Sequence, residues 1–379
     1  MLGAIIGDVI GSRFELNNTH ELEFELFTEE STFTDDTVLT VAISNALVYK
    51  TEFAIKIKEY GLKYPNAGYG YLFKNWLFDR DGLKGNSYGN GSAMRISSIA
   101  LAFDNLDIVL EKIEESCLIT HDHIDAIRGA KAIGSCIFHA RNNKSKEFIK
   151  IYIEENFHYN LNFTLNSIRE TYKFDSSCNG SVPQSIVAFL ESEDFIHSIK
   201  LAISIGGDSD TIAAMTGSIS EAYYKIIPED VLCRCLDRLP LDLKDSIMSF
   251  FIKYPKFIYE KGCDYFNLSM LSAENAIDGK DNRFDVIDKL LIGIVDIKGE
   301  QLVYNDGTKL ANAEPYNNRY YEKDAVLIKR ISDNKTFIAI SGGGYIERTT
   351  ICWPPFEIEI PIFIECSERL FNSLFSVKK

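Results

Sequence analysis

The chain has 379 residues, a net charge of −15 at pH 7 and a sequence pI near 5.0. This acidic excess argues against broad nucleic-acid binding. No segment approaches the roughly 18 uninterrupted apolar residues of a membrane span, and the opening MLGAIIGDVIGSRFE lacks the basic start of a signal peptide. The eight cysteines form no CxxC pair. We therefore expect a soluble cytoplasmic protein with reduced structural thiols and no membrane partner.

Helical periodicity dominates the chain up to about residue 265. Apolar residues recur at helical spacing in the ranges 35–50, 125–140, 145–156, 192–206 and 210–227. Gly, Asn, Pro and Asp residues separate these runs, and strand-like alternation is nearly absent. The sequence predicts an all-α domain over residues 1–270.

The pattern changes to strand-like alternation from about residue 285. The run LLIGIVDIKGEQLVYNDGTKL holds two stretches rich in β-branched residues joined by short turns, and FEIEIPIFIE continues the pattern. The polar segment LSAENAIDGKDN precedes them. We expect a linker at 271–284 and a small β-rich accessory domain at 285–379. This domain is expected to contact a protein partner or the rim of the helical cleft.

Two short acidic motifs stand where helices are expected to begin. TDDT occupies residues 34–37, and DSDT occupies residues 208–211 after Gly206 and Gly207. Asp and Thr are ordinary helix caps, but each motif holds more carboxylates than a cap requires. Carboxylates that lie together raise one another's pKa, and a hard cation removes that cost. Oxygen ligands of this kind suit Mg²⁺, Mn²⁺ or Ca²⁺ better than zinc.

Further motifs follow in a recognisable order along the chain. They are GAIIGDVIGSRFE, NAGYGYLF, SYGNGSAMRISSIA and THDHIDAIRGA, together with the two acidic motifs. In this order and spacing they resemble the ADP-ribosylglycohydrolase family over roughly residues 1–265. The resemblance implies an all-α fold, two bound Mg²⁺ or Mn²⁺ ions, and hydrolysis of ADP-ribose from an acceptor. The β-rich region is not part of the common family core.

The resemblance also implies roles for individual residues. Glu15 stands where some family members have the glutamate near the scissile bond, and Asp36 and Asp208 are the next candidates for the catalytic carboxylate. The implied metal ligands are Thr34, Asp35, Asp36, Asp208, Asp210 and Thr211. The implied substrate-binding residues are Gly68, Tyr69, Gly70, Gly89, Asn90, Gly91, Ser92, Met94 and His121.

The chemistry of these residue types agrees with the resemblance. A glycine-rich loop such as residues 89–92 can turn several backbone amides toward a diphosphate, and Arg95 is expected to add a charge-assisted contact. A metal pair can bind a ribose diol and activate a water for attack on the anomeric carbon. His123, His139 and His197 have no comparable context and are expected to be ordinary packing or surface residues.

Three hypotheses remain at this point. The favoured one is a Mg²⁺-dependent hydrolase that releases ADP-ribose from a protein substrate, with an arginine-linked acceptor preferred and a serine-linked or other acceptor as the alternative. The second is a non-catalytic ADP-ribose- or protein-binding module that uses the same cleft. The third is a two-metal hydrolase of a phosphate ester.

Overall fold

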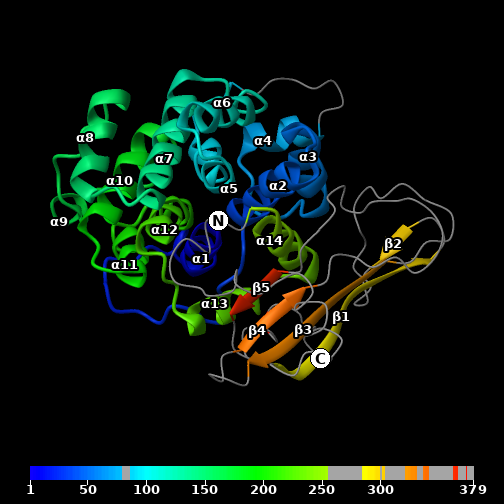
Figure 1. Cartoon of the computed structure of the whole chain (residues 1–379). Coiled ribbons are helices and arrows are strands. Elements are labelled where there is room, and N and C mark those ends of the chain that lie inside the picture. The colour runs from blue at the N-terminus through cyan, green and yellow to red at the C-terminus, as the bar shows by residue number, and fades with distance from the viewer. Residues whose placement is uncertain are drawn as a thin grey trace. The chain divides into compact units, whose positions relative to one another are not determined.

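The computed structural model describes residues 1–78, 86–254, 284–298, 301–303, 321–330, 336–340 and 362–365, and Ser373. The chain divides into two compact units, Met1–Arg238 and Leu239–Lys379. The first unit is built from helices and the loops that join them, among them a long loop at residues 15–34 (Figure 1). The prediction that the N-terminal region is helical is therefore confirmed.

The helices of the first unit follow one another closely along the chain. They are α1 (Leu2–Gly11), α2 (Asp35–Tyr49), α3 (Phe53–Lys63), α4 (Tyr71–Phe78), α5 (Ser97–Ala102), α6 (Leu106–Cys117), α7 (Ile124–Arg141), α8 (Lys146–Phe157), α9 (Leu165–Ile168), α10 (Cys178–Glu191), α11 (Phe195–Ser204), α12 (Ser209–Tyr224) and α13 (Glu229–Leu236). Two short 3₁₀ turns, η1 (Ser12–Phe14) and η2 (Asn90–Ser92), interrupt the loops.

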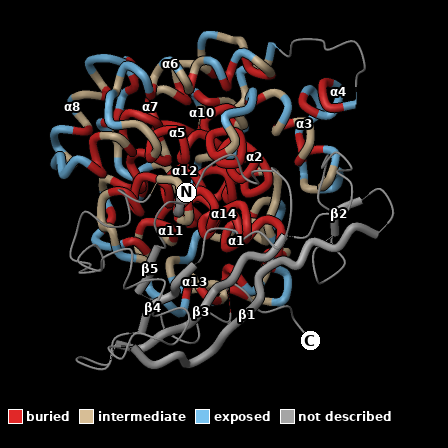
Figure 2. The backbone as a smooth tube through the Cα atoms, turned by 45° about the vertical axis from the view of Figure 1, so that its right-hand side comes forward, coloured by how far each residue is buried: buried red, intermediate tan, exposed pale blue. Residues whose placement is uncertain are grey.

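Helices α1, α2 and α12 form the buried centre of this unit, as Figure 2 shows by their mostly red tubes. Burial extends around these helices, so none of them keeps a wide polar face. Surface helices such as α6 bury one stripe only, through Val109, Ile113 and Cys117. The centre of the unit therefore consists of helices that are buried on nearly every side and carry apolar, small or hydroxyl side chains at most positions.

A stripe of glycines brings α1 and α12 into backbone contact. A Cβ atom on Gly3 would lie 2.1 Å from the carbonyl oxygen of Gly217, and one on Gly7 would lie 2.1 Å from that of Ala213. One turn further, a Cβ atom on Gly11 would lie 2.5 Å from the Cα of Asp210. Since real Cβ atoms do not approach so closely, only glycine permits this helix spacing.

Both acidic motifs begin helices in the structure. Thr34 is the N-cap of α2, and its hydroxyl accepts a hydrogen bond from the backbone N–H of Asp36 at 3.4 Å. Asp208 is the N-cap of α12, directly after Gly206 and Gly207, whose φ angles are +71° and +75°. Such positive φ angles favour glycine and turn the chain sharply into the helix. Helix capping therefore accounts for part of each motif.

The second unit contains α14 (Leu241–Lys253) and an antiparallel sheet of order β2-β1-β3-β4-β5. The strands are β1 (Phe284–Lys298), β2 (Gln301–Val303), β3 (Tyr321–Arg330), β4 (Thr336–Ile340) and β5 (Ile362–Glu365). The predicted linker at 271–284 lies outside the described residues apart from Phe284, the first residue of β1. The predicted domain boundaries stay predictions.

In the part of the chain that the structure describes, no helix combines the length and the apolar composition that crossing a membrane requires.

Candidate active site

Asp8 organises the start of α2 from the neighbouring helix α1. Its carboxylate accepts hydrogen bonds from the backbone N–H groups of Thr34 and Thr37, at 2.9 and 3.0 Å. The hydroxyls of the same two threonines donate to it at 2.7 and 2.5 Å. Asp8 is fully buried, so these four donors satisfy a carboxylate that has no access to water. Asp8 was not predicted as a site residue, although an aspartate within the apolar run GAIIGDVIG is a signal that the sequence offers.

Carboxylates from three other segments lie near Asp8. Together with Asp8 they form what we call the acidic cluster: Asp8, Glu15, Asp35, Asp36, Asp208 and Asp210. One potential ligand atom from each of Asp8, Asp36 and Asp210 lies within 4.8 Å of the other two. The same limit holds for Glu15, Asp208 and Asp210. The two groups share Asp210. The first joins α1, α2 and α12, and the second joins Glu15, which follows η1, to the start of α12.

Burial raises the pKa values throughout the acidic cluster, and repulsion between its carboxylates adds to this rise at Glu15, Asp35, Asp36 and Asp210. Burial, then the charge of Asp8, raises the pKa of Asp35 to about 8. The pKa values of Asp36 and Asp210 lie well above the usual range, mainly because of burial and then because of neighbouring carboxylates. The pKa of Glu15 is raised by its partial burial and by the charges of Asp208 and Asp8. In the absence of a cation, the cluster therefore retains protons.

The donor set fits a hard divalent cation. It contains carboxylate and hydroxyl oxygens, the ligands that Mg²⁺ and Mn²⁺ prefer. Asp36 Oδ1 is buried and has no hydrogen-bond partner among the described residues, while its Oδ2 accepts from the hydroxyl of Thr211 at 3.0 Å. A buried carboxylate oxygen without a partner is costly unless a ligand completes it. Asp36 is therefore the clearest potential ligand of the cluster.

The loop of Gly68, Tyr69 and Gly70 lies beside Asp35. The backbone N–H of Asp35 donates to the carbonyl oxygen of Ala67 at 2.7 Å, and a Cβ atom on Gly68 would lie 3.2 Å from Asp35 Oδ1. A Cβ atom on Gly70 would meet nothing within 4 Å. The Tyr69 side chain is buried and stacks on Phe73, so this loop offers its backbone to a ligand more readily than its aromatic ring.

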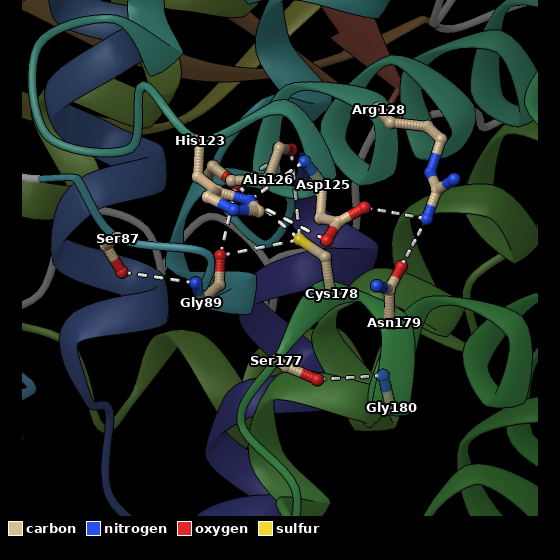
Figure 3. Close-up of polar contacts among 11 residues, drawn as sticks. Ser87, Gly89, His123, Asp125, Ala126, Arg128, Ser177, Cys178, Asn179 and Gly180 are labelled. Atoms are coloured by element: carbon tan, nitrogen blue, oxygen red, sulfur yellow. Dashed lines mark hydrogen bonds and ion pairs between the residues drawn. The ribbon is translucent and has the colours of Figure 1, made fainter.

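The loop of Gly89, Asn90, Gly91 and Ser92 is anchored to the start of α10. Asn90 N donates to the carbonyl oxygen of Ser176 at 2.8 Å. Figure 3 shows the anchor at Gly89, whose backbone N–H faces the Ser87 hydroxyl and whose carbonyl faces the thiol of Cys178. The Ser92 hydroxyl points inward and donates to Ala126 O at 3.1 Å. Hydrogen bonds with α7, with Cys178 of α10 and with Ser176 just before that helix therefore hold the loop in shape.

Asn90 connects this loop to the acidic cluster. Its side-chain amide donates to Asp208 Oδ2 at 2.8 Å and to the Ser181 hydroxyl at 3.2 Å. Asn90 is buried, and its hydrogen bond lowers the pKa of Asp208 against the larger effect of burial, which raises it. The residue predicted to bind substrate thus also orients a predicted metal ligand.

Met94 and His121 lie next to Gly91 of the loop of residues 89–92, and both are buried. A Cβ atom on Gly91 would lie 3.1 Å from His121 Nε2, and the other ring nitrogen lies 2.7 Å from the Thr120 hydroxyl. Burial and the nearby Arg95 hold the pKa of His121 well below its usual value, so the imidazole is neutral. His121 thus supports the loop from the side of the protein core.

The prediction that Arg95 contacts a phosphate is wrong. The residue is fully buried, and its guanidinium donates to Ser116 O at 2.8 Å and to the Thr120 hydroxyl at 3.0 Å. A side chain with no exposed surface is not available to a bound diphosphate. The sequence did not show which way the residue points, because it follows a 3₁₀ turn that packs against α7 and α10, which lie further along the chain.

Several known proteins are similar to this chain. A family model described as ADP-ribosylglycohydrolase matches residues 1–255. Human ADP-ribosylhydrolase ARH3 is 26% identical over 311 residues, which cover 60% of this chain and 86% of the human protein. The bovine protein of the same name is 27% identical over 316 residues, covering 60% and 85%. A solved structure described as an ADP-ribosylglycohydrolase-related protein complex is 20% identical, has a TM-score of 0.48 and covers 67% of this chain and 97% of its own.

The family model spans the helices that carry the acidic cluster and both glycine loops. The ordered motifs of the sequence and the family match point to the same conclusion. The chain belongs to the ADP-ribosylglycohydrolase family and is a hydrolase.

Proposed function

We propose that this hydrolase depends on two Mg²⁺ ions, which Mn²⁺ can replace, and releases ADP-ribose from an ADP-ribosylated protein. The observation that carries the proposal is that Asp36 and Asp210 converge beside Asp8, and Asp208 and Asp210 beside Glu15, with the potential ligand atoms of each group of three within 4.8 Å of one another. The proposed ligands are Thr34, Asp35, Asp36, Asp208, Asp210 and Thr211. When bound, such ions lower the pKa of a water and orient a ribose diol.

The two glycine loops would hold the ADP-ribose. The loop of residues 68–70 lies beside Asp35, and the loop of residues 89–92 is linked to Asp208 through Asn90. Each loop therefore neighbours one of the two acidic motifs. Open space next to Gly70 supports close approach of a ligand to the backbone.

Glu15 is the proposed acid/base at the scissile bond. Its carboxylate is half-buried, and its raised pKa favours a protonated form that can donate to a leaving group. In the proposed reaction the oxygen of water bonds to the anomeric carbon as the bond to the acceptor breaks. Glu15 gives its proton to the leaving acceptor, and the proton that the water loses restores Glu15. Asp36 and Asp208 are the next candidates, but both lie deeper, and Asp208 is already hydrogen-bonded to Asn90.

The favoured acceptor is arginine, with serine as the alternative. With Glu15 protonated, the other five carboxylates of the acidic cluster carry, when all are ionised, one negative charge more than two divalent ions neutralise. A cationic guanidinium is attracted to such a surplus, whereas a serine hydroxyl gains little from it. Release from arginine-linked and serine-linked peptides, measured side by side, distinguishes the two acceptors.

The direct test of the proposed function is a release assay with and without metal. We expect ADP-ribose to appear with Mg²⁺ and to stop appearing when a chelator is added. Activity should return with Mg²⁺ or Mn²⁺. Asp210→Asn should lose both metal binding and release. Metal-independent turnover would contradict the proposal, and AMP or inorganic phosphate as product would indicate phosphate-ester hydrolysis instead.

The C-terminal region is proposed to be an accessory module that takes no part in the chemistry. The family model ends at residue 255, before the first strand begins at Phe284. A protein partner for this region has no support from the comparisons. A reducing compartment such as the cytoplasm is also proposed, since the five cysteines within the described residues are free and buried.

A further inference from the structure

The side chain of Asn18 folds back onto two segments that are distant in sequence. Its Nδ2 lies 2.6 Å from Phe14 O, 3.3 Å from Glu15 O and 2.9 Å from Gly207 O. Its Oδ1 accepts from Gly207 N at 3.0 Å. The two N–H donors of the amide have their shortest contacts with Phe14 O and Gly207 O, the Ser209 hydroxyl lies further away at 3.4 Å, and the amide oxygen accepts from Gly207 N.

The contact with Gly207 pairs a side-chain amide with a peptide unit. The Asn18 amide donates to the carbonyl of Gly207 and accepts from its N–H, so both contacts break together if either segment moves. The turn leaves little freedom on either side. A Cβ atom on Gly206 would lie 3.2 Å from Asn18 Oδ1, and one on Gly207 would lie 2.4 Å from the ring of Tyr172.

This pairing joins Glu15 to the acidic motif of α12. Gly207 immediately precedes Asp208, and Glu15 lies three residues before Asn18. The carboxylate of Glu15 lies within 4.8 Å of ligand atoms of Asp208 and Asp210. Carboxylates so close repel one another, so an uncharged contact is needed to hold Glu15 near them. Asn18 supplies such a contact without adding another charge.

Other asparagines show what an ordinary contact of this kind looks like. The exposed Asn156 donates to Tyr152 O at 2.8 Å, and Asn142 donates to Phe138 O at 2.7 Å. Each reaches the carbonyl four residues earlier, as Asn18 does with Phe14. Asn18 differs through its contacts with Gly207, across 189 residues of sequence.

We propose that Asn18 is a positioning residue that holds Glu15 against the Gly207 turn and thereby at the proposed scissile bond. This inference rests on the proposed role of Glu15. A second contact holds the same segment, because a ring nitrogen of His20 lies 3.1 Å from Ser204 O. Replacing Asn18 should therefore shift Glu15 without unfolding the segment.

The first experiment measures ADP-ribose release by Asn18→Ala, with Asn156→Ala as the matched control. We expect kcat to fall roughly tenfold for Asn18→Ala, with KM and Mg²⁺ affinity changed by less than about threefold, because misplacement affects the chemical step. Asn156→Ala should match the wild type. Asn18→Asp, which keeps the volume but loses the donors, should repeat the loss. A kcat within about twofold of wild type for both Asn18 variants overturns the inference.

A double-mutant cycle tests whether Asn18 acts through Glu15. If it does, adding Asn18→Ala to Glu15→Gln should lower the rate by less than about twofold, because the group being positioned is already lost. A full additional loss would assign Asn18 a structural role and overturn the inference.

Hydrogen exchange of the Gly207 N–H tests the contact between Asn18 and Gly207 independently of catalytic activity. The Gly207 N–H loses its acceptor in Asn18→Ala and should exchange faster, while Asn156→Ala leaves it unchanged. Unchanged exchange in Asn18→Ala overturns the contact itself. A wild-type rate for Glu15→Gln alone would count against the proposed function, and faster Gly207 exchange would then still support the contact.

Discussion

Gly11 of α1 and Asp210 of α12 are so close that a Cβ atom on Gly11 would lie 2.5 Å from the Cα of Asp210. Asp210 belongs to both groups of converging carboxylates, and Asp8 lies one turn before Gly11 on α1. The spacing between the backbones of α1 and α12 therefore sets the distance between the carboxylates of Asp8 and Asp210, which are far apart in the sequence.

Gly11→Ala tests this relationship. The new methyl group must push α1 away from α12, and overpacking of this kind costs about 1–3 kcal/mol in unfolding free energy. We expect a lower melting temperature and weaker Mg²⁺ binding measured by calorimetry. Gly61→Ala in α3 is the control, because its Cβ would meet the flexible end of Leu77 at 2.8 Å. Equal Mg²⁺ affinity in both variants would show that helix spacing does not control the cluster.

Asp8→Asn tests the hydrogen bonds that join α1 to the start of α2. The amide nitrogen of asparagine cannot accept from Thr34 and Thr37, so part of this network must break. Groups that orient metal ligands typically contribute 10–100-fold in affinity, so we expect Mg²⁺ binding to weaken by about tenfold or more. Asp107→Asn, at the exposed first turn of α6, should bind Mg²⁺ as the wild type does.

Glu15→Gln and Asp210→Asn should separate proton transfer from metal binding. Loss of the acid/base group typically lowers the rate by about 10²-fold or more, so Glu15→Gln should lose kcat while its affinity for ADP-ribose is nearly unchanged. Asp210→Asn should lose metal and ligand affinity together. Timed assays of ADP-ribose release measure kcat, and calorimetry with Mg²⁺ and with ADP-ribose measures the two affinities. Wild-type turnover by Glu15→Gln would pass the role to Asp36 or Asp208.

The stability of the metal-free protein should fall as the pH rises from about 5 to 8. The pKa of Asp35 is about 8 in the folded protein and near 3.9 in an unfolded chain, so folding favours its protonated form. Because the folded chain binds this proton more tightly, the stabilisation is complete below pH 4 and is lost as the pH approaches 8. Melting temperatures measured in chelator at several pH values test this prediction.

Asp35→Asn is the control for this pH dependence. It removes the titrating group, so the melting temperature in chelator should depend less on pH and should be higher than that of the wild type at pH 8. At pH 8, saturating Mg²⁺ should give the wild type the higher melting temperature, because the ion stabilises only the chain that keeps the Asp35 carboxylate as a ligand. A wild-type protein that becomes more stable in chelator between pH 5 and 8 would contradict the assignment.

Truncation after residue 270 tests the accessory role of the C-terminal region. If the acidic cluster and both glycine loops suffice, the shortened chain should bind Mg²⁺ and release ADP-ribose from small substrates at nearly the full rate. Loss of Mg²⁺ binding would show that the C-terminal region is needed for the site. The same assay on protein substrates measures any contribution to acceptor binding.

Local sequence was sufficient to predict the helical class of the N-terminal region and the two acidic helix starts. Helical periodicity and capping depend on residues within a few positions of one another, so they can be recognised without knowledge of the packing. The motifs at 34–37 and 208–211 begin α2 and α12 as expected. Their order with the glycine loops also predicted the family.

Only the tertiary structure decided which side chains face the acidic cluster. Asp8 joins it because the glycine stripe of α1 permits backbone contact with α12, while Arg95 and Tyr69 turn into the core. The Asn18 contact joins positions that are 189 residues apart. The direction of each side chain depends on how its helix or turn packs against its neighbours, and such long-range packing leaves no regular spacing in the sequence.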